Sequence, residues 1–302
     1  MAFSPPGRVT AQMTAAMQDE VFTPGQVIYH EGEPAARLYF IVDGSVELTR
    51  PGAETWRLDE NSMIGILDAA LDRPYSRTAV ARVPTSTIVL HFADYLDILE
   101  DNFDYARRML QFGSRRHDDL ALELAPDGVF LERAPEAVKV SAGSCHQLNT
   151  LERLLALRST RFFMRAPVQA IASLAKLVEQ RHFEPEETLF QLGDAADELH
   201  ILIRGTARVE RDIPTVVADF HPIRVVAGLA AFGHDHHQYR AVAKSRVDTL
   251  VLRKDDLFDV AEDQFELARS LFAHIAVERE RTMQARQSRR SMSRFAELPI
   301  PD

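Results

Sequence analysis

Cysteine is almost absent from this chain, since Cys145 is the only one among 302 residues. It cannot form an intrachain disulfide, so a reducing, cytoplasmic location fits the sequence best. No apolar run reaches the roughly 18 residues that a membrane helix needs, and the N-terminus lacks the hydrophobic core of a signal peptide. A formal net charge of −10 argues against a general nucleic-acid binder.

The sequence also lacks the short motifs of common enzyme active sites. It has no glycine-rich Walker loop, no Gly-x-Ser-x-Gly elbow and no Rossmann fingerprint. Cys145 has no neighbour that would activate it as a nucleophile. The 46% hydrophobic content is enough for folded cores, and the length of 302 residues predicts two domains. We therefore expect a folded two-domain protein that is not an enzyme.

What the chain does contain is an internal repeat. Residues 22–50 (FTPGQVIYHEGEPAARLYFIVDGSVELTR) align without a gap with residues 183–211 (FEPEETLFQLGDAADELHILIRGTARVER). Further along, a glycine and an arginine twelve residues apart occur in both copies. Agreement of this density indicates that one domain occurs twice.

Each copy has the pattern of several short strands joined by tight turns. Residues 38–48 and 199–209 alternate in polarity, and we expect each to form a hairpin that turns at Gly44 or Gly205. Many short strands with regular turns are typical of an antiparallel roll or barrel. The predicted fold is therefore mainly β with flanking α-helices, in two antiparallel β-rolls of the jelly-roll type.

Amphipathic helices are expected beside each roll, at residues 95–124 and 148–180, with Pro167 dividing the second of these. The segment between them contains two prolines and two glycines with little periodicity, which is typical of a linker. The expected organisation is a first domain at 1–124, a linker at 125–148, a second domain at 149–276 and a basic tail at 277–302.

These motifs resemble the cyclic nucleotide-binding domain family, which includes the bacterial cyclic-AMP receptor protein and kinase regulatory subunits. Residues 22–32 are similar to the first strands of that family, and residues 38–48 to its most recognisable element. The resemblance implies a phosphate cassette from Gly65 onward, with a glycine-glutamate pair, a short helix and an arginine before small residues. In the family, the glutamate binds the ribose 2′-hydroxyl, while the arginine and helix-start amides bind the cyclic phosphate.

Both copies depart from this pattern at the glutamate. Ile66 stands there in the first copy and Leu229 in the second, whereas Arg77 and Arg240 keep the other end of the cassette. A lost hydrogen bond to a charged group costs about 1.5–3 kcal/mol, or roughly one to two orders of magnitude in affinity. The candidate ligand-binding residues are Gly65, Ile66, Leu67, Asp68, Arg77 and Thr78 in the first domain, and Gly228, Leu229, Arg240 and Ala241 in the second, which we expect to be degenerate.

The first cassette leaves three alternatives open. Asp68 is a substitute for the missing ribose carboxylate, and the second copy has no acid at the equivalent place. Arg77 has a structural alternative, in which it pairs with Asp68 or Asp72 and fixes the cassette helix. Arg73 is a further candidate for the phosphate ligand.

A histidine-rich segment in the second copy, residues 233–240 (GHDHHQYR), suggests a metal or anion site at first sight. Consecutive residues rarely converge on one ion, and no second ligand cluster has the spacing of a zinc site. We therefore expect a solvated loop and assign no metal.

The C-terminal segment has an apolar face from Phe265 to Ala276, followed by an arginine-rich run. The resemblance implies that a helix here forms a two-fold dimer seam. The residues after Ile275 are too few for the winged helix-turn-helix of the related transcription factors, so we expect no DNA binding. The basic run suits an acidic partner or a membrane surface, but an ordinary solvated helix end is the simplest interpretation.

The sequence as a whole favours a non-enzymatic regulatory or adaptor protein whose nucleotide binding is weak, atypical or lost and whose output passes through protein partners. The alternative is a sensor that binds a cyclic nucleotide or cyclic dinucleotide in the first domain. A transcription regulator without its DNA-binding domain is a third, disfavoured interpretation. A cyclic nucleotide is the one cofactor suggested, and a homodimer is an open possibility.

Overall fold

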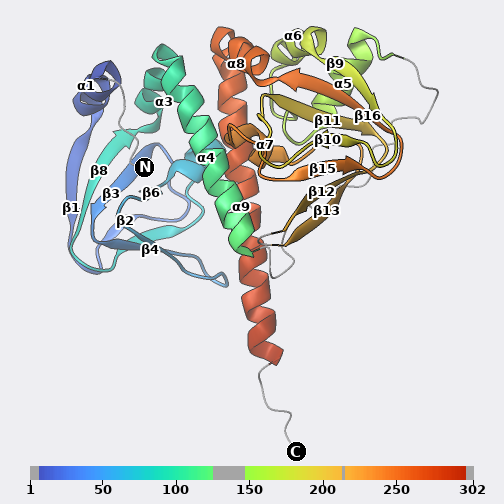
Figure 1. Cartoon of the computed structure of the whole chain (residues 1–302). Coiled ribbons are helices and arrows are strands. Elements are labelled where there is room, and N and C mark those ends of the chain that lie inside the picture. Colours follow the sequence, from blue (N-terminus) through green and yellow to red (C-terminus); the bar gives the residue numbers. More distant parts are fainter. Residues whose placement is uncertain (1–6, 125–146, 213–214, 297–302) are drawn as a thin grey trace, which may run out of the picture. The chain divides into compact units, whose positions relative to one another are not determined.

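The computed structural model describes residues 7–124, 147–212 and 215–296 (Figure 1). The chain forms two compact units, the first ending at Ala106 and the second beginning at Arg107. Among the described helices, none is both long enough and apolar enough to cross a membrane.

The first unit is a β-roll preceded and followed by helices. Its elements are α1 (Gly7–Ala16), β1 (Gln18–Phe22), β2 (Val27–Tyr29), β3 (Arg37–Asp43), β4 (Ser45–Thr49), β5 (Trp56–Asp59), β6 (Met63–Ile64), α2 (Ile66–Ala70), β7 (Thr78–Ala81), β8 (Thr85–His91), α3 (Phe92–Asp101) and the beginning of α4 (Phe103–Leu124). The strands form two antiparallel sheets, in the orders β1-β8-β3-β6 and β2-β7-β4-β5. Their inner faces enclose an aromatic and aliphatic core that includes Tyr29, Ile41, Val46 and Ile64.

The second unit repeats this arrangement. Its elements after α4 are α5 (Thr150–Ser159), α6 (Val168–Leu177), β9 (Glu179–Phe183), β10 (Thr188–Phe190), β11 (Glu198–Arg204), β12 (Ala207–Arg211), β13 (Val216–Phe220), β14 (Arg224–Val225), α7 (Gly228–Gly233), β15 (Arg240–Ala243), β16 (Val247–Arg253), α8 (Lys254–Asp263) and α9 (Phe265–Ala296). Its sheets have the orders β9-β16-β11-β14 and β10-β15-β12-β13, which match the first unit strand for strand. The predicted fold class and the duplication are thereby confirmed.

The two predicted hairpins are wrong. Strands β3 and β4 belong to different sheets, as do β11 and β12, so the glycine between them leads the chain from one sheet to the other. Gly44 has a φ of +96°, and a Cβ there would lie 2.5 Å from the carbonyl oxygen of Pro84. Alternating polarity predicts strands and a tight turn but not the pairing partner, which the enclosure of the roll decides.

The flanking helices differ in detail from the prediction. Pro167 does separate two helices, since it stands at the N-cap of α6 while α5 ends at Ser159. The helix expected at 95–124 is interrupted at Asn102, and from Arg107 on, α4 packs with the second unit although the sequence grouped it with the first. The predicted linker falls mostly on residues 125–146, outside the described residues.

The basic C-terminal segment is not a separate tail in the described part of the chain. Helix α9 continues through it to Ala296. Glu278 is buried, and Thr282 Oγ1 lies 3.1 Å from Nε2 of His117 on α4. The expectation of a solvated helix end is therefore wrong for its first turns, because they pack against α4.

Candidate functional site: the two phosphate cassettes

The first cassette, residues 65–80, lies between β6 and β7 and contains the short helix α2. Gly65 begins it with a φ of +88°, and a Cβ there would lie 2.7 Å from the Arg37 carbonyl oxygen and 3.2 Å from Cε1 of Tyr75. Glycine is thus required by backbone conformation and by packing. Ile66 and Leu67 follow it in α2, and both are half-buried.

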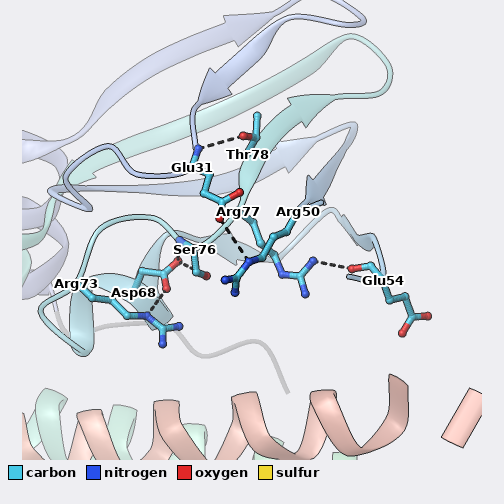
Figure 2. A network of polar contacts seen from close by, with 8 residues as sticks. All are labelled: Glu31, Arg50, Glu54, Asp68, Arg73, Ser76, Arg77 and Thr78. Atoms are coloured by element: carbon cyan, nitrogen blue, oxygen red, sulfur yellow. Dashed lines mark hydrogen bonds and ion pairs between the residues drawn. The ribbon is translucent and has the colours of Figure 1, made fainter. Parts of the chain in front are cut away.

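Asp68 organises the loop that follows α2 (Figure 2). Its buried carboxylate accepts hydrogen bonds from Nε of Arg73 at 2.7 Å, from the Ser76 amide at 3.0 Å and from the Ser76 hydroxyl at 3.1 Å. A buried carboxylate needs such donors to offset its desolvation. Asp68 therefore closes the cassette loop on itself, and Arg73 is its ion-pair partner.

Arg77 turns to a different part of the roll. Its Nη1 donates to the carbonyl oxygen of Glu54 at 2.6 Å, and its guanidinium carbon lies 3.8 Å from the ring centre of Trp56 on β5. The residue is 7% exposed. The alternative in which Arg77 pairs with Asp68 or Asp72 is not observed, because Asp68 is paired with Arg73 and Arg77 stacks on the tryptophan.

Thr78 follows at the start of β7, where its hydroxyl accepts a hydrogen bond from the Glu31 amide at 3.0 Å. The carboxylate of Glu31 in turn lies 3.4 Å from Nε of Arg50. Figure 2 shows these contacts beside those of Asp68 and Arg77. Arg73 and Arg77 of the cassette and Arg50 after β4 each have a partner within the first domain.

In the second cassette, residues 228–243, the predicted residues are spread between core and surface. Gly228 has a φ of +45°, and Leu229 is buried in α7, whose residues are all apolar or glycine. Arg240 is exposed at the start of β15, whereas Ala241 is buried within the sheet. The left-handed residue before the cassette helix is Gly65 in the first domain and Ala227 in the second. Ala81 and Ala243 occupy the same place in the sheets, so Arg77 corresponds to Tyr239, and the predicted pairing of Gly65 with Gly228 and of Arg77 with Arg240 is wrong by one residue.

The structure also shows an aromatic cluster that the sequence reading missed. In the first domain, the rings of Tyr29 and Tyr75 stack at 3.7 Å between centroids, and Tyr39 lies 5.7 Å from Tyr29. Tyr75 belongs to the cassette, and its hydroxyl donates to the Arg37 carbonyl oxygen at 2.7 Å. The stacking of Tyr75 on Tyr29 therefore anchors the cassette loop to the core of the roll.

The second domain has the same cluster with two histidines. Phe190 and His237 stack at 3.7 Å, and His200 lies 5.7 Å from Phe190. The backbone shows the equivalence, because the Gly32 amide donates to the carbonyl of Tyr75, and the Gly193 amide to that of His237, at 2.9 Å in both cases. The gap-free alignment would have paired Tyr29 with Phe190 and Tyr39 with His200. The third pair, Tyr75 with His237, is hidden because the second domain has one extra residue in a loop before it.

Both of these histidines are buried, each with 4% exposure. Burial lowers the pKa of His200 to about 4, and burial also lowers the pKa of His237 to about 4. The expectation of a fully solvated histidine loop is therefore wrong at His237, which is part of the core. Within the described residues, no group of three histidine, cysteine or acidic side chains is arranged to hold a metal ion.

An ion pair beside each cluster has opposite polarity in the two domains. In the first domain Glu20 on β1 pairs with Arg37 on β3. At the equivalent places in the second, Arg181 on β9 donates from both terminal nitrogens to Glu198 on β11, at 2.6 and 2.7 Å. The guanidinium of Arg181 lowers the pKa of the Glu198 carboxyl. An ion pair therefore joins the same two strands in both rolls, with its charges in opposite order.

Several solved structures resemble the chain weakly. A mutant regulatory subunit of a cAMP-independent protein kinase A from Trypanosoma brucei has 17% identity, with 86% of this chain and 84% of that chain covered and a TM-score of 0.35. The regulatory domain of Toxoplasma gondii protein kinase A has 12% identity, coverage of 87% and 90%, and a TM-score of 0.32. The sensor domain of the transcriptional regulator DNR from Pseudomonas aeruginosa has 24% identity, coverage of 31% and 70%, and a TM-score of 0.30.

No curated protein sequence matches the chain. The model of one family, described as the cyclic nucleotide-binding domain, matches it twice, at residues 19–102 and 180–264. Each match contains one roll and its cassette, and together they account for more than half of the chain. The chain belongs to the cyclic nucleotide-binding domain family and carries two such domains in tandem.

Proposed function

We propose that this protein is a non-enzymatic, cytoplasmic regulatory protein that acts through protein partners, and that nucleotide binding by its cassettes is weak or lost. The observation that carries the proposal is the position of Arg77. A ligand phosphate would have to replace the Glu54 carbonyl and the face of Trp56 as its partners. The side chain that would meet the ribose hydroxyl is that of Ile66, which offers no acceptor.

The cost of this substitution follows from hydrogen bonding. A ribose hydroxyl that loses a charged acceptor forfeits about 1.5–3 kcal/mol, and an unpaired hydroxyl in an apolar site adds a desolvation cost. Asp68 does not compensate for it, because its carboxylate is bonded to Arg73 and Ser76. In the second domain, the residue that directly follows the left-handed N-cap of the cassette helix is Gly228, which offers no acceptor either.

The test is thermal-shift titration of the full chain with cyclic AMP, cyclic GMP and cyclic di-GMP, followed by calorimetry. Bound ligand at about 100 times its dissociation constant would stabilise the chain by roughly 2.7 kcal/mol. We expect no saturable shift for the wild type, and about a 10- to 100-fold gain in affinity for Ile66→Glu, which restores the carboxylate. Gly228→Glu, at the corresponding place in the second cassette, is the matched control and should gain nothing.

A sensor function in the first domain is the second candidate. The observation that favours it is the retention of Arg77 and Thr78 at the end of the cassette, with Arg50 and Arg73 close by (Figure 2). A saturable shift in the wild-type chain that disappears in Arg77→Ala and persists in Arg240→Ala would establish this function and overturn the first proposal.

A further inference from the structure

Helix α4 lies along the second unit from Arg107 onward. At its first turns there, Nη2 of Arg107 lies 2.9 Å from the Asp255 carboxylate, and the guanidinium carbon lies 4.4 Å from the ring centre of Phe258. Both partners belong to α8. Further along, Gly113 approaches Ile275 of α9, where a Cβ would lie 3.4 Å from Cγ2. These contacts join α4 to both α8 and α9.

Helix α4 also packs closely against the cassette helix α7. Gly233 is the last residue of α7, and a Cβ there would lie 2.8 Å from the Arg115 amide nitrogen, 2.8 Å from Cβ of Ser114 and 3.1 Å from the carbonyl oxygen of Gln111. Gly233 is not among the glycines with positive φ in the described chain, so its backbone conformation does not demand glycine. The residue is small because the two helices touch there.

One turn beyond this contact, α4 places a carboxylate on the cassette loop. Asp118 is 3% exposed. Its Oδ1 accepts a hydrogen bond from the Tyr239 hydroxyl at 2.8 Å, and its Oδ2 lies 3.2 Å from Nε2 of His234 without hydrogen-bond geometry. His234 and Tyr239 stand at the two ends of the loop that joins α7 to β15, so one side chain of α4 bridges the whole loop.

Other groups complete the enclosure of this loop. Nζ of Lys254 donates to the His234 carbonyl oxygen at 2.7 Å, and the guanidinium of Arg211 lies 5.8 Å from the Tyr239 ring centre. Burial and the adjacent Asp118 carboxylate raise the pKa of Tyr239, so the phenol remains a donor. A buried carboxylate with a tyrosine donor is costly to separate, because each group would lose its partner inside the protein.

We propose that α4 is the resident occupant of the second domain's cassette. The second domain binds a helix of its own chain there, Asp118 is the residue that positions the cassette loop on that helix, and the loop is released only when α4 withdraws. This inference does not depend on whether the first domain binds a nucleotide, because all of the contacts lie within the second unit.

Hydrogen–deuterium exchange of the full chain tests the proposal. Loss of one charge-assisted hydrogen bond should raise the opening equilibrium of the loop about 10- to 100-fold. We expect that increase in Asp118→Asn for peptides that cover residues 228–240, with no change in β16. Asp119→Asn, which alters the exposed neighbouring acid, is the matched control and should exchange like the wild type.

Two further measurements keep the test decisive. Tyr239→Phe removes only the hydroxyl, and it should raise loop exchange by a similar factor. In the double variant with Asp118→Asn, the increase in loop exchange should be far smaller than the product of the two single increases, because both changes break the same bond. The proposal is overturned if loop exchange is unchanged, if β16 exchanges faster to the same extent, or if the two effects multiply.

Discussion

Replacing the two buried histidines by the residues of the first domain should make the second domain resistant to acid. The change is His200→Tyr together with His237→Tyr, which copies Tyr39 and Tyr75. The geometry allows it, because the rings of both clusters stack at the same 3.7 Å and 5.7 Å separations. The added hydroxyl at position 237 would meet the carbonyl of residue 198 as the Tyr75 hydroxyl meets that of residue 37.

The magnitude follows from the pKa shifts. The pKa of each histidine falls from 6.5 to about 4 in the folded domain, mainly through burial. The unfolded chain therefore takes up protons between pH 6.5 and 4 that the folded chain does not, so stability is greatest above pH 6.5 and falls as the pH is lowered. Linkage gives a loss of about 2 kcal/mol for each histidine between pH 8 and pH 5, and about 3 kcal/mol for each by pH 4.

The assay can follow the two domains separately. Trp56 is the only tryptophan in the chain and lies in the first domain, so its fluorescence during urea unfolding reports that domain. Hydrogen exchange of β11 and β16, corrected for the intrinsic effect of pH, reports the second. We expect acid sensitivity in the second domain that is strongly reduced in the double variant. His221→Tyr, at an exposed position, should leave the wild-type profile unchanged.

The reasoning fails if the double variant loses stability between pH 8 and pH 5 as steeply as the wild type. His274 is also buried, and burial lowers its pKa to about 3, so a residual slope is expected from it. His274→Phe in the double-variant background separates that contribution. A profile that changes only in this triple variant would assign the acid sensitivity to α9 and not to the cluster.

Two further predictions concern the first cassette. Gly65→Ala should destabilise the first domain by several kcal/mol more than Gly32→Ala. Both glycines have φ near +89°, but only Gly65 has an atom within 3 Å of the new Cβ. Equal losses of stability, measured from urea unfolding midpoints, would contradict this reasoning. Arg77→Ala should lower the free energy of unfolding by about 2–4 kcal/mol, because it removes the hydrogen bond to the Glu54 carbonyl and the stacking on Trp56. Arg240→Ala, at an exposed site, should lower it by less than about 0.5 kcal/mol in calorimetric unfolding. Equal effects of the two variants would contradict the structure.

Much of the fold was predictable because the sequence contains two copies of the same domain. The alignment of residues 22–50 with 183–211 fixed the equivalent strands, and the turn glycines marked where each strand ends. The sheet partners were not predictable in the same way. A glycine such as Gly44 permits a hairpin and a passage between sheets equally well, and only the closure of the roll distinguishes them.

The candidate site was predictable in position but not in its internal bonding. Spacing located Gly65 and Arg77, whereas two acids and two arginines within one short loop allow several pairings. The observed pairing of Asp68 with Arg73 depends on how α2 ends, and the stacking of Arg77 depends on Trp56 from another strand. Contacts from distant segments, such as that of Asp118 on the second cassette, have no local signature at all.

The reversed ion pairs of the two rolls have a consequence for folding. Tandem copies of one domain can exchange equivalent strands, and such exchange is a characteristic misfolding route of duplicated proteins. If β9 entered the first roll in place of β1, Arg181 would face Arg37; if β1 entered the second roll, Glu20 would face Glu198. Each correct roll has one positive and one negative partner, and each exchanged roll has two like charges. The charges at these positions therefore favour pairing of each strand within its own roll and disfavour exchange between the two rolls.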